Sequence, residues 1–248
     1  ILKSGWHGPE FYAAMWQVLL DKGDWSGEIW NRHTNGEIYA VLENICAIKD
    51  ERGKTQNYVA LLTEITHMKR HEQKLERMAQ YDALTGLPNR VLLSDRLLQA
   101  MAQTLRHKQV LAIACIDLDG FKAVNDNFGH HTGDELLITI SQRMKATLRE
   151  GDTLARWGGD EFIAVLVDLE RLQDCELVLE RFLQAAAEPV IVGDAVLHVS
   201  ASIGVTIYPH DGQDTDHLFR CADQAMYQAK QAGKNCYQIF EGGSVPKP

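Results

Sequence analysis

The chain has 248 residues, 45% hydrophobic content and a formal net charge of −9, which is enough to bury one or two globular cores. The negative charge argues against a nucleic-acid-binding surface, because affinity for phosphate backbones comes from clustered Lys and Arg. No apolar run approaches the ~20 residues of a membrane helix and the N-terminus has no signal-peptide pattern, so we expect a soluble cytoplasmic protein unless a preceding segment carries an anchor.

The cysteines and the chain ends give further expectations. The five cysteines show no CxxC spacing and mostly have apolar neighbours, so we interpret them as reduced core residues: Cys46, Cys115, Cys175, Cys221 and Cys236. The sequence begins at Ile1 without a methionine and ends in the linker-like EGGSVPKP. We therefore expect a fragment of a longer protein, with room for further domains outside it.

The first region is predicted to be a helix followed by a small sheet. Residues Pro9 to Leu20 have helical spacing, and the following residues alternate as in strands. Asn35–Gly36 and Glu51–Gly53 are turn signals. These patterns predict about three antiparallel strands, too few to close a stable domain alone.

A charged, glycine-free run from Thr66 to Gln80 predicts a connecting helix. Apolar residues near heptad positions allow either a solvated single helix or a short parallel coiled coil that dimerises the chain. These residues are Ile65, Met68, Leu75, and Met78 or Ala79.

A larger domain is predicted from Tyr81 to about Phe240. Val110–Ile116 is typical of a buried strand that enters the acidic pair Asp117 and Asp119. Thr132–Glu135 has the pattern of a capping box that opens an amphipathic helix.

The second half of this domain is predicted to contain a hairpin, a strand and a helix. Strands Thr153–Trp157 and Glu161–Val167 flank Gly158–Gly159, a dipeptide expected at a tight turn. A strand over Leu197–Tyr208 precedes a helix from about Asp216 to Ala232, which Gly233 should end.

The acidic residues suggest a metal site. Asp117 and Asp119 lie two residues apart, so both point to one side of a strand, and Asp160 and Glu161 follow the hairpin turn. Carboxylates of this kind suit Mg²⁺, which binds a few acids together with substrate phosphates. An isolated Asp-x-Asp is, however, more typical of a strand end or a helix cap.

No P-loop pattern is present, but another phosphate cradle is available. Backbone N–H groups at Gly120 and Phe121, together with Lys122, follow the acids directly. Lys230 and Lys234 lie four residues apart across a helix end, so both could reach one triphosphate. The alternative for these lysines is an ordinary solvated face.

Several motifs in order resemble the GGDEF family of diguanylate cyclases, from about Tyr81 to Phe240. They are Asp82-Ala-Leu-Thr-Gly-Leu-Pro-Asn-Arg90, Asp117-Leu-Asp-Gly-Phe-Lys-Ala-Val-Asn-Asp126, Phe128-Gly-His130, Gly133-Asp134 and Arg156-Trp-Gly-Gly-Asp-Glu-Phe162. The region from Trp25 through Thr66 resembles the C-terminal half of a PAS sensor domain, with Glu64-Ile65-Thr66 in place of the usual Asp-Ile-Thr ending.

The resemblance implies an α+β fold, with a central, mostly antiparallel sheet flanked by helices as in a polymerase palm. It implies part of a PAS domain with its own sheet at 1–66, a signalling helix at 67–80, a GGDEF domain at 81–241 and a tail at 242–248.

The implied reaction joins two GTP molecules into cyclic di-GMP, with release of two diphosphates, in a homodimer whose two half-sites each hold one GTP. Asp117, the carbonyl of Leu118 and Asp160 would hold Mg²⁺, or Mn²⁺ in its place. Glu161 would complete the site or act as base for the ribose 3′-hydroxyl, and Lys122 would stabilise transition-state charge. The PAS ligand is unknown.

Guanine would be read by Asn125 and Asp134, with His130 nearby. A carboxylate accepts from guanine N1–H and the exocyclic amine together, whereas adenine has an unprotonated N1, so GTP is selected over ATP. A turn residue at Asn125 and a first-turn acid at Asp134 are the structural alternatives. Lys230 and Lys234 would contact the β and γ phosphates, although Arg is more usual at the second position.

Arg149 and Asp152 match an Arg-x-x-Asp inhibitory site that binds the product, with a helix-ending salt bridge as the alternative. Two other functions stay open. One is a non-catalytic GGDEF module that binds GTP or cyclic di-GMP and regulates a partner domain. The other is a PAS scaffold whose GGDEF unit serves a domain beyond Pro248.

Overall fold

The computed structural model describes residues 4–169, 171 and 173–241, so the predicted tail at 242–248 lies outside the described residues. The chain divides into two compact units between Arg77 and Met78. Each unit has its own sheet and is considered separately.

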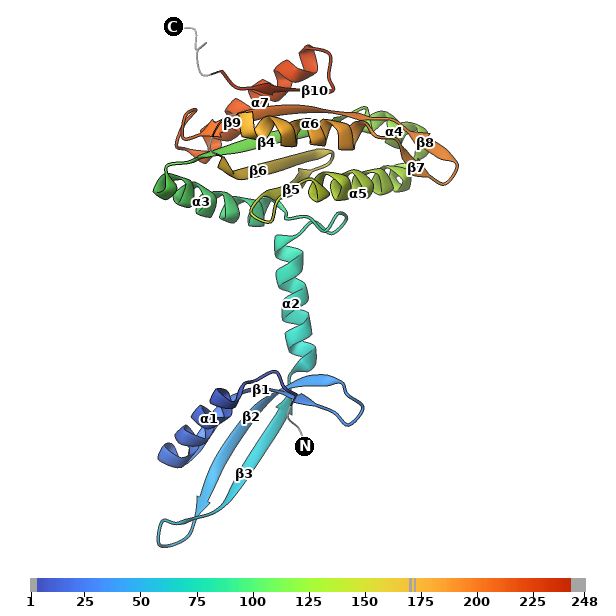
Figure 1. The fold of residues 1–248 in the computed structure, drawn as a ribbon. Coiled ribbons are helices and arrows are strands. Elements are labelled where there is room, and N and C mark those ends of the chain that lie inside the picture. Colours follow the sequence, from blue (N-terminus) through green and yellow to red (C-terminus); the bar gives the residue numbers. More distant parts are fainter. Residues whose placement is uncertain (1–3, 170, 172, 242–248) are drawn as a thin grey trace. The chain divides into compact units, whose positions relative to one another are not determined.

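The first unit is a helix packed on one face of a three-stranded sheet (Figure 1). Helix α1 (Pro9–Lys22) precedes strands β1 (Asp24–Arg32), β2 (Ile38–Lys49) and β3 (Thr55–Glu64). All pairings in the order β1-β2-β3 are antiparallel. The predicted helix, strands and turns are confirmed, and Gly36 and Gly53 have the positive φ of 91° and 78° that such turns need.

The core of this unit is small and leaves β3 uncovered. Met15 and Leu19 of α1 pack against Ile29, Val41 and Ile45 of β1 and β2. Every residue of β3 after Thr55 is exposed. The described part of this unit therefore buries only two of its three strands.

Helix α2 (Thr66–Gln80) is confirmed and begins directly after β3. Thr66 fixes its start, because its hydroxyl oxygen accepts from the backbone N–H of Ala40 at 3.0 Å. The predicted heptad residues Met68, Leu75 and Met78 are 59%, 54% and 63% exposed. The apolar stripe of α2 is therefore open to solvent along the described chain.

The second unit is built on a five-stranded sheet of order β10-β9-β4-β6-β5. Only the β10–β9 pair is parallel, so the predicted α+β fold with a mostly antiparallel sheet is confirmed. Its elements are α3 (Arg90–His107), β4 (Val110–Asp119), α4 (Phe121–Phe128), α5 (His130–Ala146), β5 (Thr153–Gly158), β6 (Glu161–Leu169), α6 (Gln173–Ala187), β7 (Val190–Val192), β8 (Ala195–Leu197), β9 (Ser200–Tyr208), α7 (Thr215–Gln231) and β10 (Cys236–Ile239).

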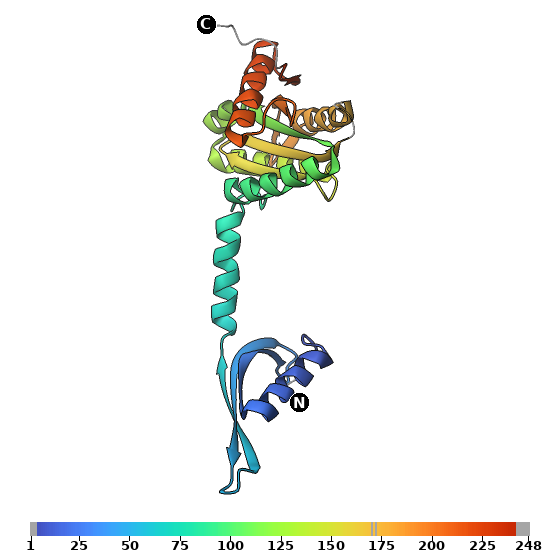
Figure 2. The ribbon, with the colours of Figure 1, turned by 90° about the vertical axis from the view of Figure 1, so that its left-hand side faces the viewer.

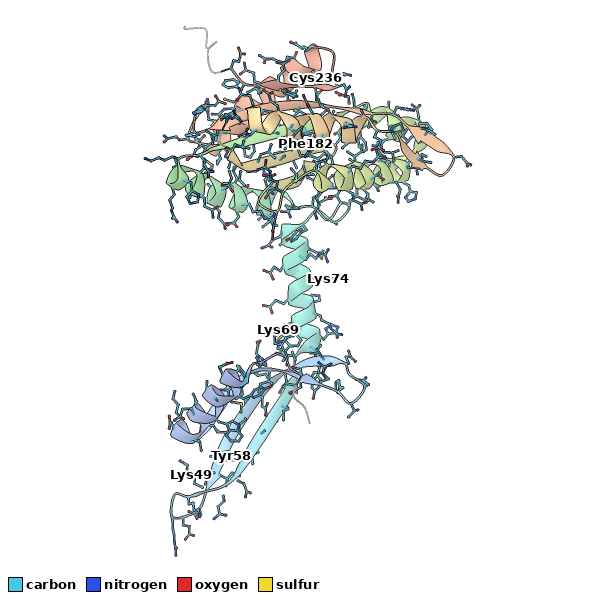
Figure 3. The ribbon with its side chains drawn as sticks, in the orientation of Figure 1. Lys49, Tyr58, Lys69, Lys74, Phe182 and Cys236 are labelled. Atoms are coloured by element: carbon cyan, nitrogen blue, oxygen red, sulfur yellow. The ribbon has the colours of Figure 1, made fainter. Side chains whose placement is uncertain are left out.

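Helices cover both faces of this sheet (Figure 1, Figure 2). Residues of α5 and α6 pack on one face, where Phe182 of α6 is fully buried (Figure 3). Residues of α3 and α7 pack on the other face. Strand β4 is central and buried at every residue from Leu111 to Ile116, which explains its continuous apolar sequence.

Two predicted helix and strand boundaries are wrong. Thr132 is not an N-cap, because α5 already begins at His130 and the Thr132 hydroxyl donates to the Phe128 carbonyl at 2.9 Å. Gly129, at φ 84°, breaks the chain between α4 and α5, so the new helix starts at once. The predicted strand Leu197–Tyr208 is two strands, since Leu197 belongs to β8 in a separate hairpin with β7.

The β5–β6 turn is also shifted by one residue from the prediction. Gly158 still pairs with Glu161, so the two turn residues are Gly159 and Asp160 rather than Gly158 and Gly159. Gly159 has a φ of 52°, which glycine adopts without steric cost. An acidic residue therefore occupies the turn itself.

Helix α7 approaches the backbone of β9 closely at Gly204, which leads to the first prediction. A Cβ there would lie 2.1 Å from both the Ala222 carbonyl oxygen and the Met226 nitrogen. We expect Gly204→Ala to lower the free energy of unfolding by about 3 kcal/mol or more, because the backbone of α7 must move away from β9. Urea unfolding would measure this loss of stability. Gly158→Ala, with nothing within 4 Å of its added Cβ, is the control, and equal effects would contradict the prediction.

Candidate active site

The predicted metal ligand Asp117 lies near the C-terminal end of the central strand β4. It stands opposite Glu161 of β6 on one side and Ser202 of β9 on the other. Its side chain is 17% exposed. Because β4 is hydrogen-bonded along both edges, the position of this carboxylate is fixed by the sheet.

The β5–β6 hairpin brings two more predicted acids to the same end of the sheet. Asp160 is half-buried in the turn and Glu161 begins β6. The backbone N–H of Leu118 donates to the Asp160 carbonyl at 3.3 Å. This bond joins the hairpin turn to β4, so that Asp117, Asp160 and Glu161 converge.

Helix α7 adds a cation and a fourth acid. Lys230 Nζ lies 2.9 Å from Asp117 Oδ2. Asp223, one heptad earlier in α7, lines the same small cavity as Glu161. We call Asp117, Asp160, Glu161 and Asp223 the carboxylate cluster.

Charge and burial perturb the acids of the hairpin. Burial raises the pKa of Glu161, and the neighbouring Asp117, Asp223 and Asp160 raise it further, while Lys230 opposes them. Burial and Asp117 likewise raise the pKa of Asp160, against the opposing charges of Lys230 and Arg156. The carboxylate cluster therefore has an excess of negative charge, the condition that attracts a cation.

Sequence reasoning missed the role of Asp223. Its signal was its spacing of seven residues from Lys230, which places both on one face of a helix. Without the fold, nothing connected that face to Glu161.

Asp119, the second acid of the predicted pair, is structural instead. It is 9% exposed and accepts from the Ser200 and Ser202 hydroxyls, each at 2.8 Å. The backbone N–H of Asn235 also approaches it at 3.4 Å. Both of its oxygens are therefore used in tying β4 to β9 and to the loop before β10.

The predicted phosphate cradle lies where β4 meets α4. Gly120 has a φ of 86° and precedes α4, so Phe121 and Lys122 form the first turn of a helix rather than a loop. Phe121 is buried, whereas Lys122 is exposed. Free N–H groups at a helix start, beside an exposed lysine, form a surface that favours anions.

The predicted guanine-reading residues lie on α4 and α5. Asn125 of α4 packs closely against α5, since a Cβ on Gly133 would lie 1.9 Å from Asn125 Oδ1. Asp134 follows Gly133 directly and is exposed, as is His130 at the start of α5. The structure thus brings Asn125 beside the turn of helix that carries Asp134.

Lys234 lies beyond the end of α7, is exposed, and has a left-handed φ of 64°. The two lysines therefore differ in their surroundings: Lys230 is paired with Asp117, whereas Lys234 is exposed.

Arg149 and Asp152 line a cavity of about 400 Å³ together with Arg96, Lys145 and Tyr81. Asp152 is committed to the backbone, accepting from the N–H groups of Arg149 at 3.2 Å and Val167 at 3.1 Å. Arg149 is exposed. The predicted inhibitory pair thus lies at a real cavity, with basic residues from α3 and α5 that sequence reasoning missed.

A latch formed by Asp82 and Arg156 secures the hairpin from outside the sheet. Arg156 Nη1 donates to the Asp82 carboxylate at 3.1 and 3.2 Å, and its Nε and Nη2 donate to the Gly159 carbonyl at 2.9 and 2.8 Å. The backbone N–H of Arg156 donates to the Pro88 carbonyl at 3.0 Å. The motif beginning at Asp82 therefore supports the residue next to Asp160.

The protein by itself supplies only some of the ligands that a Mg²⁺ ion needs. Within residues 4–169, 171 and 173–241, no group of three or more His, Cys, Asp or Glu side chains has a spacing that could hold a metal ion. Mg²⁺ keeps water and phosphate ligands and takes few carboxylates from a protein. Asp117 and Asp160 suit such a site.

Fold and site together are those of a GGDEF domain. The family model described as "Diguanylate cyclase, GGDEF domain" matches residues 79–236. The chain therefore belongs to the GGDEF domain family, whose members act in cyclic di-GMP metabolism.

Known proteins agree with this assignment. The chain is 44% identical over 176 residues to the bifunctional diguanylate cyclase/cyclic di-GMP phosphodiesterase MucR of Pseudomonas aeruginosa, covering 71% of this chain and 26% of MucR. It is 38% identical over 181 residues to the cyclic di-GMP phosphodiesterase NbdA of the same species, covering 73% of this chain and 23% of NbdA. The chain thus spans about a quarter of the length of these relatives.

A solved structure of the isolated GGDEF domain of TpbB (YfiN) from P. aeruginosa is also similar. It has a TM-score of 0.63 and 35% identity, and the match covers 65% of this chain and 95% of that one.

The Asp82–Arg156 latch gives the second prediction. Burial raises the pKa of Asp82, but hydrogen bonds from Thr85 and the charge of Arg156 outweigh it, so the pKa is lowered overall. The resulting stabilisation is complete above the unfolded-state pKa of about 3.9 and is lost as pH falls through the lower folded-state value. We expect Asp82→Asn to cost about 1–3 kcal/mol of unfolding free energy at pH 7 and a smaller amount at pH 3, because part of the charge-dependent stabilisation is lost below the unfolded-state pKa.

Urea unfolding at pH 7, 5 and 3 measures this dependence. Asp95→Asn is the control, because Asp95 accepts only an exposed bond from Gln99 in the same helix. An Asp82→Asn deficit that is equal at pH 3 and pH 7 would show that the charge of Asp82 is unimportant.

Proposed function

We propose that the chain is a diguanylate cyclase that converts two GTP into cyclic di-GMP and two diphosphates. The observation that carries the proposal is the convergence of Asp117, Asp160 and Glu161 at one end of the sheet, beside the cation of Lys230. The family assignment supports it. In each half-reaction, the ribose 3′-oxygen of one GTP attacks the α-phosphorus of the other, and diphosphate leaves.

Asp117, Asp160 and the carbonyl of Leu118 would hold Mg²⁺, or Mn²⁺ in its place. When bound, such an ion neutralises the triphosphate and polarises the α-phosphate. The excess negative charge of the carboxylate cluster supports this assignment.

Glu161 would accept the proton of the 3′-hydroxyl. Its raised pKa suits this role, because a carboxylate with a higher pKa is a stronger base and takes a proton more readily. Lys122 would stabilise charge on the phosphate in the transition state, and the N–H groups of Gly120 and Phe121 would receive phosphate oxygens. Lys230 and Lys234 would contact the β and γ phosphates.

Asn125 and Asp134, with His130 nearby, would read the guanine. The Asn125 side chain is held against α5, which positions it for one edge of a base. Asp134 is exposed and free to accept from N1–H and the exocyclic amine, as its role requires.

The function would require a homodimer, since each domain holds one GTP and the reaction joins two. The exposed apolar residues of α2 support pairing through that helix.

We also propose that residues 1–66 are the C-terminal part of a PAS domain, that 67–80 form a signalling helix and that the GGDEF domain spans 81–241. The helix and three antiparallel strands of the first unit support this reading. None of the described helices is long and apolar enough to cross a membrane.

A non-catalytic module that binds GTP or cyclic di-GMP and regulates a partner domain is the second candidate. NbdA, at 38% identity, is named a phosphodiesterase, so similarity to this chain does not require cyclase activity. The presence of suitable residues at every catalytic position favours the enzyme.

The deciding experiment incubates the purified chain at several protein concentrations with GTP and Mg²⁺ and separates the nucleotides by chromatography with mass detection. We expect cyclic di-GMP, with a rate that rises more than linearly with protein concentration. Glu161→Gln should abolish turnover while keeping the fold, because it removes the base and its charge. GTP binding without product in the unaltered chain would establish the regulatory module instead.

Product inhibition gives the fourth prediction. Arg149 is exposed at its cavity and could donate forked hydrogen bonds to a phosphate or to guanine. We expect Arg149→Ala to raise the amount of cyclic di-GMP that accumulates, with the initial rate unchanged. Full progress curves, with and without added product, would measure this. Glu150→Ala, at the same cavity, is the control, and identical inhibition curves would make Arg149 merely structural.

A further inference from the structure

Lys230 contacts a proposed metal ligand, in addition to its proposed role at the phosphates. Its Nζ is 2.9 Å from Asp117 Oδ2. Its positive charge also opposes the rise in the pKa of Asp160 and of Glu161 that burial and the neighbouring acids cause, so it acts on more of the carboxylate cluster than Asp117 alone. One lysine thus lies where the proposed metal ion would find its charge balance.

The pair is well held on both sides. The Asp117 side chain is 17% exposed and that of Lys230 33% exposed, and each comes from a regular element, β4 or α7. A metal ion approaching Asp117 must displace this ammonium or bind next to it against like charge. The apoprotein should therefore bind divalent cations weakly.

A bound nucleotide changes this balance. A triphosphate carries several negative charges and offers Lys230 new partners within reach of the same site. If the ammonium moves from Asp117 to the phosphates, it frees the Asp117 oxygen for the metal while the phosphates supply the remaining ligands. Metal and nucleotide would then favour each other's binding.

We propose that Lys230 is a placeholder cation that couples metal binding to nucleotide binding: it blocks Asp117 in the empty site and releases it only when a triphosphate arrives. This inference rests on the proposed metal role of Asp117 and adds to it a reason for ordered filling of the site. It assigns Lys230 a positioning role that Lys234 does not share, because Lys234 is exposed beyond the end of α7.

Linkage makes the inference quantitative. If nucleotide raises metal affinity by some factor, the metal raises nucleotide affinity by the same factor. Removing the placeholder should weaken this coupling by improving metal binding in the empty site. Loss of an ordinary phosphate contact would have no such effect, since it only weakens nucleotide binding.

The test measures Mn²⁺ binding to the full chain by the electron paramagnetic resonance signal of free Mn²⁺, with and without α,β-methylene-GTP, which cannot react. Lys230→Met is compared with the matched control Lys234→Met and with the unaltered chain. We expect Lys230→Met to raise nucleotide-free Mn²⁺ affinity about tenfold, equivalent to about 1.4 kcal/mol, and to lower affinity for the analogue. Lys234→Met should lower affinity for the analogue alone.

Equal nucleotide-free Mn²⁺ affinities in Lys230→Met and Lys234→Met would overturn the placeholder role. If the analogue fails to raise Mn²⁺ affinity even in the unaltered chain, the proposed metal site itself is wrong and the inference falls with it. Unfolding followed by circular dichroism checks each variant, and Lys230→Gln replaces Lys230→Met if the latter is not folded.

Discussion

The gathering of negative charge at one end of the five-stranded sheet is the constraint on which the site depends. Asp117, Asp160, Glu161 and Asp223 come from three separate elements, yet the hairpin acids have raised pKa values because they share one partly buried region. Neighbouring carboxylates repel each other, and partial burial strengthens the repulsion because the local dielectric falls. Such a cluster persists only if the scaffold holds it and a cation balances it.

The scaffold meets this demand through backbone hydrogen bonds more than through side-chain packing. Strand β4 is paired along both edges, and the Asp160 carbonyl is tied to the N–H of Leu118. The Arg156 guanidinium then fastens the Gly159 carbonyl to Asp82, in a loop remote in sequence. The hairpin is thus held from two directions, by the backbone bond to β4 and by the Arg156 side chain.

Most of the fold was predictable from sequence because periodicity and motif order report on neighbours along the chain, whereas the roles of the site residues stay predictions that rest on the family resemblance. The buried strand before Asp117 and the helix ended by Gly233 are examples. The errors arose where local patterns compete. Thr132 matches the pattern of an N-cap, but the helix begins at His130, directly after Gly129. Long-range partners gave no local signal, so the bonds from Ser200 to Asp119 could not be anticipated.

The position of the acids also bears on which groups each chain would supply to the proposed reaction. The proposed guanine-reading residues lie on α4 and α5, whereas the acids lie on β4, the hairpin and α7, and the described part of the chain offers one set of each. In the proposed reaction, a 3′-hydroxyl that attacks a phosphate on another nucleotide would therefore need a second chain. A site that binds metal and nucleotide together would make the reaction of the two half-sites dependent on substrate, because neither half-site offers both a 3′-hydroxyl and a neutralised triphosphate until it is loaded.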